Sequence, residues 1–229
     1  MPRARFYFEG DLSLFLLPSL RGREIERSWS DTDTLMHVVE SIGVPHTEVE
    51  WIERDGDLIR VYPRRPERLE APRFVLDQHL GRLAAYMRML GFDVVHTVPA
   101  PDEELAAISS RQDRVLLTRD VGLLKRKEVR LGYFVRATDP RVQLSEVVKR
   151  FCLVAMIAPF TRCFRCNILL QHVDKAAIAG RLPERTAELH DAFMSCPACG
   201  RVYWKGSHYD RMRALIERIK TENPEHECG

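Results

Sequence analysis

The period of apolar and polar positions changes along the chain and divides it into three parts. In residues 1–64 the pattern predicts four short strands and one helix. The strands are expected at 5–8, 24–29, 48–53 and 58–62, and the helix at 34–41, with Asp31 or Asp33 as its cap. Asp55 and Gly56, between the last two strands, are typical of a tight hairpin. The first part is therefore predicted to be a small α+β module.

A second part begins after a proline-rich segment. Residues 65–72 carry Pro66 and Pro72 among charged side chains, and proline interrupts both helices and strands, so we expect a stiff linker there. From 73 to 158, short apolar runs alternate with helical periods, which is typical of a parallel sheet with helices on both faces. Strands are expected at 74–76, 92–95, 115–117 and 133–135, and helices at 80–90, 103–110, 121–125 and 142–151.

The third part, residues 159–221, contains two C-x-x-C pairs and is followed by a tail at 222–229. Helices are expected at 175–179 and 210–220. The pairs are Cys163 with Cys166 and Cys196 with Cys199. Four thiolates in two such knuckles favour one structural zinc ion in tetrahedral coordination. A thioredoxin-like redox site is the alternative, but it needs only one C-x-x-C pair.

Composition limits the class of protein. The chain has 229 residues, of which 45% are hydrophobic, so it can bury the cores of one to two domains. Its apolar stretches are shorter than the roughly 20 residues that cross a bilayer. The N-terminus lacks the pattern of a secretory signal. Of the two remaining cysteines, Cys152 is expected to be buried and Cys228 lies in the tail. We expect a cytoplasmic protein with no membrane contact.

Charge is distributed unevenly although the net charge is only +2. Residues 1–70 hold 10 Lys/Arg against 14 Asp/Glu, whereas residues 71–150 hold 14 against 10. A basic middle part is compatible with a nucleic-acid partner, but a charge of this size does not establish one.

Acidic side chains follow two of the strands predicted in the second part. Asp77 comes directly after one apolar run, and Asp120 comes shortly after another. Carboxyl ends of parallel strands share one edge of a sheet, so these acids can converge there, close to Asp102 at the start of a helix. Carboxylates are ligands that Mg²⁺ and Mn²⁺ prefer. Alternatively, Asp102 only caps its helix, and Asp77 and Asp120 are turn residues.

Several ordered motifs resemble one family. The runs "FVLDQHLGRLAAYMRMLGFDVV", "PDEELAAI", "RVLLTRD" and "VRATDPRVQLSEVV", with the paired cysteines after them, are similar to the PIN-like RNase domain of the Mut-seven C-terminal family over about residues 73–215. This resemblance implies a PIN-like fold and a ribonuclease that depends on Mg²⁺ or Mn²⁺. It implies that Asp77, Asp102 and Asp120 form the acidic cluster. Further candidate members of that cluster are Glu103, Glu104 and Asp139.

Basic and aromatic residues provide candidates for RNA contacts. Arg82 lies one turn after Asp77, and Lys125 and Arg126 follow Asp120. In "RVYWKGSHYDRM", which matches the end of the same family, the candidates are Trp204, Lys205, His208 and Arg211. Aromatic side chains stack on unpaired bases, so single-stranded RNA or a 3′ end is the expected substrate. The alternatives are a solvated basic helix face and aromatic packing inside the zinc ribbon.

The first part resembles the ubiquitin-like β-grasp module that often precedes this RNase domain, because its elements follow the order strand, strand, helix, strand, strand. The resemblance implies a docking module that guides substrate or binds a protein partner. Two other functions stay open for the whole chain. One is a non-catalytic RNA-binding or adaptor protein with a degenerate PIN-like site, and the other is a disulfide oxidoreductase.

Overall fold

The computed structural model describes residues 1–97 and 99–224. Cys228 and most of the predicted tail therefore lie outside the described residues. The contacts divide the chain into two compact units. The first comprises Met1–Glu67, Phe74–Leu80 and Thr97–Arg136, and the second comprises Arg68–Arg73, Gly81–His96 and Ala137–Gly229.

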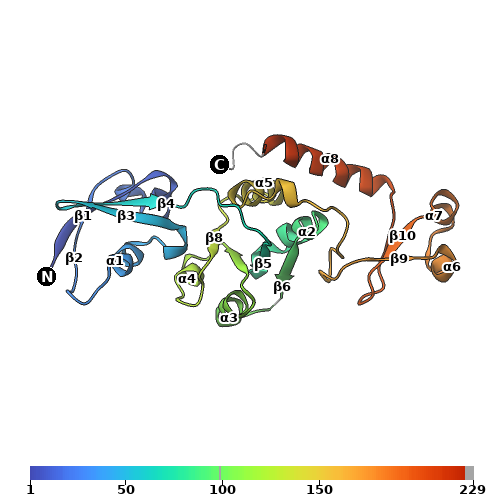
Figure 1. Cartoon of the computed structure of the whole chain (residues 1–229), viewed down its shortest axis with the longest axis horizontal. Coiled ribbons are helices and arrows are strands. Elements are labelled where there is room, and N and C mark those ends of the chain that lie inside the picture. The colour runs from blue at the N-terminus through green and yellow to red at the C-terminus, as the bar shows by residue number, and fades with distance from the viewer. Residues whose placement is uncertain (98, 225–229) are drawn as a thin grey trace. The chain divides into compact units, whose positions relative to one another are not determined.

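The predicted α+β module is present at the start of the chain (Figure 1). Its elements are β1 (Arg3–Phe8), β2 (Ile25–Ser28), α1 (Leu35–Ile42), β3 (Val49–Asp55) and β4 (Leu58–Pro63). The strands form one sheet in the order β2-β1-β4-β3, in which β1 and β4 are parallel and the outer pairs antiparallel. The inward-facing side chains Phe6, Val39 and Ile59 are fully buried, because strand alternation and the apolar face of α1 direct them to one core.

The cap of α1 differs from the prediction. Thr34 precedes the helix, and its hydroxyl accepts a hydrogen bond from the N–H of His37 at 3.1 Å. Asp33 instead accepts from the N–H of Ser30 in the preceding turn. The helix ends at Gly43, whose φ of 141° is a conformation that other residues rarely adopt.

A four-stranded sheet in the order β6-β5-β7-β8 forms the predicted α/β part. Parallel pairing joins β5 to β7 and β7 to β8, with Leu76 opposite Leu117 and Leu117 opposite Tyr133. The strands are β5 (Arg73–Leu76), β6 (Asp93–His96), β7 (Val115–Thr118) and β8 (Gly132–Phe134). The flanking helices are α2 (Gly81–Met89), α3 (Asp102–Gln112), α4 (Val121–Leu124) and α5 (Pro140–Arg150). The predicted α/β class is confirmed.

The cysteine-rich part contains a small antiparallel sheet in the order β11-β10-β9. Its strands are β9 (Gln171–Val173), β10 (Phe193–Ser195) and β11 (Val202–Tyr203). The sequence pattern did not predict them, because each has only two or three residues. The helix α6 (Lys175–Ile178) was expected, whereas α7 (Glu184–Leu189) was not.

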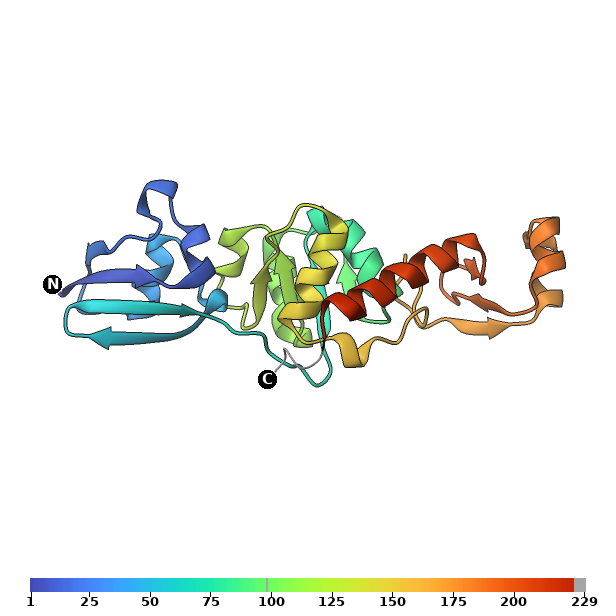
Figure 2. The same cartoon turned by 90° about the horizontal axis from the view of Figure 1, so that it is seen from above.

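The last helix, α8 (Ser207–Glu222), is longer than predicted, and its end lies beside α5 (Figure 2). Asn223 follows it and is buried, with its amide donating to the hydroxyl of Ser145 at 3.0 Å. The chain therefore stays packed beyond residue 222, where the tail was expected. Among the described residues, no helix combines the length and the apolar character that a bilayer span requires.

Within the first unit, the front module docks on the segment from α4 to β8. The carboxylate of Glu48, which is 4% exposed, accepts hydrogen bonds from the N–H of Phe134 at 2.6 Å and from Arg136 at 2.8 Å. One ring nitrogen of His46 lies 2.8 Å from the carbonyl oxygen of Val129, and its other nitrogen lies 2.7 Å from Glu40. The module thus uses part of its surface for contacts within the chain.

Candidate acidic site and cysteine cluster

The strand ends bring Asp77 and Asp120 to one edge of the sheet. Asp77 follows β5 and is 6% exposed. Its carboxylate accepts hydrogen bonds from the N–H of His79 at 2.8 Å, from the N–H of Arg119 at 3.1 Å and from the hydroxyl of Thr118. The oxygen of that same hydroxyl accepts from the N–H of Asp120 at 2.9 Å. Thr118 therefore links the carboxylate of Asp77 to the backbone of Asp120.

Asp120 has a structural task as well. It caps α4, because its Oδ1 accepts from the N–H groups of Gly122 at 2.6 Å and Leu123 at 3.1 Å. Both of these bonds go to Oδ1, and the side chain is exposed. A ligand at the strand ends can therefore approach Oδ2. The turn-residue alternative and the ligand alternative are compatible at this position.

Asp102, Glu103 and Glu104 occupy the first turn of α3, and all three are exposed. Negative charges there complement the partial positive charge of a helix N-terminus. Glu103 also lies 3.9 Å from Arg126, which is equally close to Glu128. Among the described residues, one group of three or more Asp, Glu, Cys or His side chains is close enough together to hold a metal ion. It consists of the four cysteines, whose sulfur atoms all lie within 4.8 Å of one another. The three aspartates do not form a cluster that tight.

The other residues that the sequence suggested for this site have partners or lie in the second unit. Lys125 donates to the carbonyl of Glu40 at 2.6 Å, and burial lowers the pKa of its ammonium. Asp139 caps α5 by accepting from the N–H of Arg141 at 2.8 Å. Arg82 is exposed on α2, directly after Gly81, where an added Cβ would come within 3.2 Å of the His96 ring.

The four cysteines of the two knuckles meet in the second unit. All four sulfur atoms lie within 4.8 Å of one another, and those of Cys163 and Cys199 are 3.8 Å apart. Zn–S bonds of about 2.3 Å put two ligands of a tetrahedral site about 3.8 Å apart. Cys163 and Cys196 are buried, whereas Cys199 is exposed. The dimensions and the donor set fit a metal ion such as zinc.

The surroundings of Cys163 favour its thiolate. Burial raises the pKa of this thiol, but hydrogen bonds from the Tyr203 hydroxyl at 3.1 Å and from the N–H groups of Cys166 and Arg165 outweigh burial and lower the pKa to about 6. Tyr203 also packs its ring against Phe164, with centroids 5.1 Å apart. Tyr203 is thus part of the cysteine site.

The remaining substrate candidates follow the second knuckle. Trp204 is 37% exposed, and Lys205 lies over the Tyr209 ring with its nitrogen 5.8 Å from the centroid. On α8, a guanidinium nitrogen of Arg211 lies 3.0 Å from Nδ1 of the exposed His208. All four candidates therefore belong to one surface region of the second unit.

Sequence reasoning missed Thr118 and Glu48. The position of Thr118, two residues before Asp120 at the end of an apolar strand, is a signal that would have found it. Nothing local marks Glu48, because its partners, Phe134 and Arg136, lie more than 80 residues away in the sequence.

Comparison with protein families gives two matches. Residues 72–216 match the Mut7-C RNAse domain, and residues 1–68 match the Mut7-C ubiquitin module. The first match covers more than half of the 229 residues, so the chain belongs to the Mut7-C RNAse domain family. Both resemblances noted in the sequence are thereby confirmed. Comparisons with curated proteins and with solved structures found no match.

Proposed function

We propose that the chain is a metal-dependent ribonuclease whose acidic site is built on Asp77 and Asp120, with Asp102 as a further ligand. The link between Asp77 and Asp120 through Thr118, at the ends of adjacent parallel strands, carries this proposal. Membership of an RNase domain family supports the reaction class. Magnesium needs only one or two protein carboxylates, because it retains several waters, so the looser arrangement of the three acids suits it.

The chain's own residues hold and orient this site. Three hydrogen bonds fix the carboxylate of Asp77, and the cap bonds of Asp120 hold its Oδ1 while its side chain stays exposed to solvent. A bound Mg²⁺ or Mn²⁺ would supply an activated water and charge stabilisation at the phosphodiester. Arg126 is the basic side chain of the first unit proposed to meet substrate phosphates, and Arg82 is proposed as a phosphate contact in the second unit.

The four cysteines are proposed to hold a structural zinc ion. Four sulfur ligands leave no open coordination position, so this zinc stabilises the fold and takes no part in hydrolysis. The alternative of a thioredoxin-like redox site is disfavoured because it needs only one pair of cysteines, whereas all four sulfur atoms converge here. Thiolate ligands stay reduced in a compartment such as the cytoplasm, which is the proposed location.

Replacing Asp120 with Asn tests the proposal. Asn is an equally good helix cap, so Asp120→Asn keeps α4 while removing a negative metal ligand. We expect cleavage of labelled RNA with Mn²⁺ or Mg²⁺ by the parent, none with chelator and none by the variant. Asp113→Asn is the matched control, because Asp113 ends α3 in a left-handed conformation that Asn tolerates. Full activity of Asp120→Asn would remove this residue from the mechanism.

A second candidate is a non-catalytic RNA-binding protein. It is favoured by the absence, among the described acids, of a set as tight as the cysteine cluster. This candidate predicts RNA binding by the parent without cleavage under any metal condition.

A further inference from the structure

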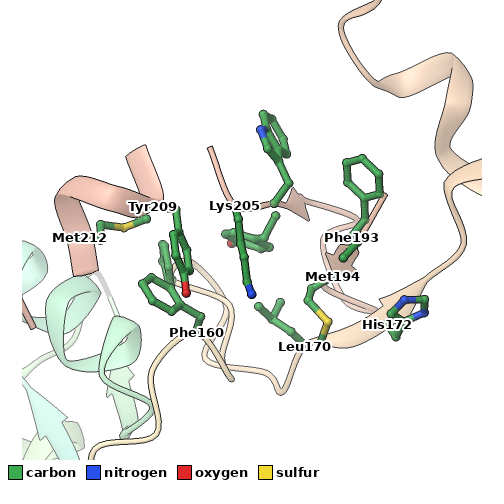
Figure 3. A pocket seen from close by; sticks show the side chains of 12 residues that line it. Phe160, Leu170, His172, Phe193, Met194, Lys205, Tyr209 and Met212 are labelled. Atoms are coloured by element: carbon green, nitrogen blue, oxygen red, sulfur yellow. The ribbon is translucent and has the colours of Figure 1, made fainter. Parts of the chain in front are cut away.

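An apolar cavity of about 200 Å³ opens in the second unit between the β9–β11 sheet and the start of α8. The rings of Phe160 and Tyr209, with centroids 4.6 Å apart, form one side of it, and Leu170 and Met194 lie on the other (Figure 3). We call it the aromatic cavity. Its volume is below the roughly 300 Å³ at which pockets for drug-sized ligands begin, so it suits a single small ring system.

Lys205 brings a positive charge into this apolar setting. Its side chain extends between the two sides of the aromatic cavity, with the ammonium toward Leu170 (Figure 3). Of the twelve described residues that line the cavity, none is Asp or Glu. An ammonium among aromatic side chains and without a carboxylate beside it attracts an anionic ligand.

Two larger cavities lie next to the aromatic cavity or to each other. Trp204 and Tyr209 line both the aromatic cavity and a second cavity of about 700 Å³. His208 and Met212 line that second cavity and a third of about 600 Å³. Shared lining residues therefore make the three cavities neighbours in the second unit.

The third cavity is strongly basic. We call it the basic groove, and its lining includes three arginines, Arg141, Arg211 and Arg218, together with His208. Among the described lining residues of the second and third cavities there is no carboxylate. Arg218 has an ion-pair partner, Glu222 at 3.6 Å, which lies outside the lining. A polyanion can follow the groove without meeting like charge.

We propose that the aromatic cavity binds one unstacked base of single-stranded RNA, while Lys205 and the basic groove contact the flanking phosphates. Bases stack on aromatic side chains, and phosphates pair with Arg and Lys, so one ligand satisfies both parts of the surface. A purely apolar peptide would leave the cations unused. The proposal rests on the proposed ribonuclease function, because it assigns the form of RNA that this enzyme takes.

Binding to an unstructured RNA oligonucleotide tests the proposal. The full chain with its zinc is titrated without added Mg²⁺ or Mn²⁺, so that cleavage does not interfere, against the intact RNA and a series with one abasic nucleotide at each position. Base stacking predicts that Trp204→Ala weakens binding of intact RNA about 5- to 150-fold. The sensitive position is the one at which removal of the base weakens binding by the parent. Trp204→Ala should bind the RNA that is abasic at this position about as well as the parent does.

A matched control exists in the front module. Trp51 is 38% exposed and stacks on Tyr62 with centroids 4.5 Å apart, so Trp51→Ala removes an indole of similar exposure that does not line the aromatic cavity. We expect unchanged RNA affinity. Zinc content and thermal unfolding check that each variant is folded. If Trp204→Ala unfolds, quenching of 2-aminopurine at the sensitive position in the parent complex replaces it as the readout.

Each outcome is decisive. Equal affinity of the parent for the intact RNA and every abasic RNA would overturn the base-binding proposal. If Trp204→Ala lost the same factor of affinity for intact and for abasic RNA, that result would overturn it too. Unquenched 2-aminopurine would do the same. A protein that selects the base but fails to cleave RNA with Mn²⁺ would overturn only the proposed ribonuclease activity.

Discussion

Removing the Glu48 carboxylate should strongly destabilise the first unit. Glu48 is buried and accepts hydrogen bonds from the N–H of Phe134 and from Arg136, at 2.6 and 2.8 Å. Breaking a buried ion pair from one side costs about 3–5 kcal/mol. Arg136 retains Asp11 at 2.8 Å, which offsets part of this loss. We therefore expect Glu48→Ala to lower the free energy of unfolding by about 3 kcal/mol, the lower end of that range.

Urea unfolding followed by tryptophan fluorescence measures this effect. Trp29 is buried against Phe6, with centroids 5.7 Å apart, so its emission reports on the front module. Glu48→Gln should lose less stability than Glu48→Ala, because its amide oxygen still accepts from one donor. Glu26→Ala removes an exposed partner of Arg3 and should change the midpoint little. A Glu48→Ala midpoint equal to that of Glu26→Ala would refute the role given to this pair.

Two further variants test the second unit. Cys196→Ser should release zinc and expose residues 160–220 to protease, because the binding energy of a structural zinc is folding energy; unchanged zinc content and protease resistance would contradict the zinc assignment. Replacing Lys205 and Arg211 together with Ala should weaken RNA binding for all sequences and reduce the slope of log affinity against log salt by about 1.4, since a single strand releases about 0.7 counterion per contact. A loss of affinity with an unchanged slope would reject the phosphate contacts.

The Glu48 pair also connects the front module with the acidic site. Arg136 binds Glu48, and its carbonyl accepts from the side chain of Arg119 at 2.8 Å. The backbone N–H of Arg119 in turn donates to Asp77 at 3.1 Å. Arg136 and Arg119 thus connect the ubiquitin-like module to the first acid, each through hydrogen bonds at two of its groups. Cleavage assays on Glu48→Ala would show whether this connection affects activity.

The sequence by itself determined the order and type of most elements. Apolar periodicity located the strands of both larger sheets, because a buried strand must place apolar residues where the pleat faces the core. It also placed Asp77 and Asp120 at strand ends, and the knuckle spacing predicted the convergence of four sulfur atoms. These features depend on residues that are close together in the sequence, so a local sequence pattern is enough to predict them.

Only the tertiary structure decided which side chains share a site. Thr118 joins Asp77 to Asp120 because β5 and β7 are adjacent, although about 40 residues separate them in the sequence. Glu48 accepts hydrogen bonds from Phe134 and Arg136 because the front module docks on β8. The lining of the aromatic cavity likewise comes from segments as distant as Phe160 and Tyr209. Contacts between distant segments depend on how whole elements pack, and no local pattern records that packing.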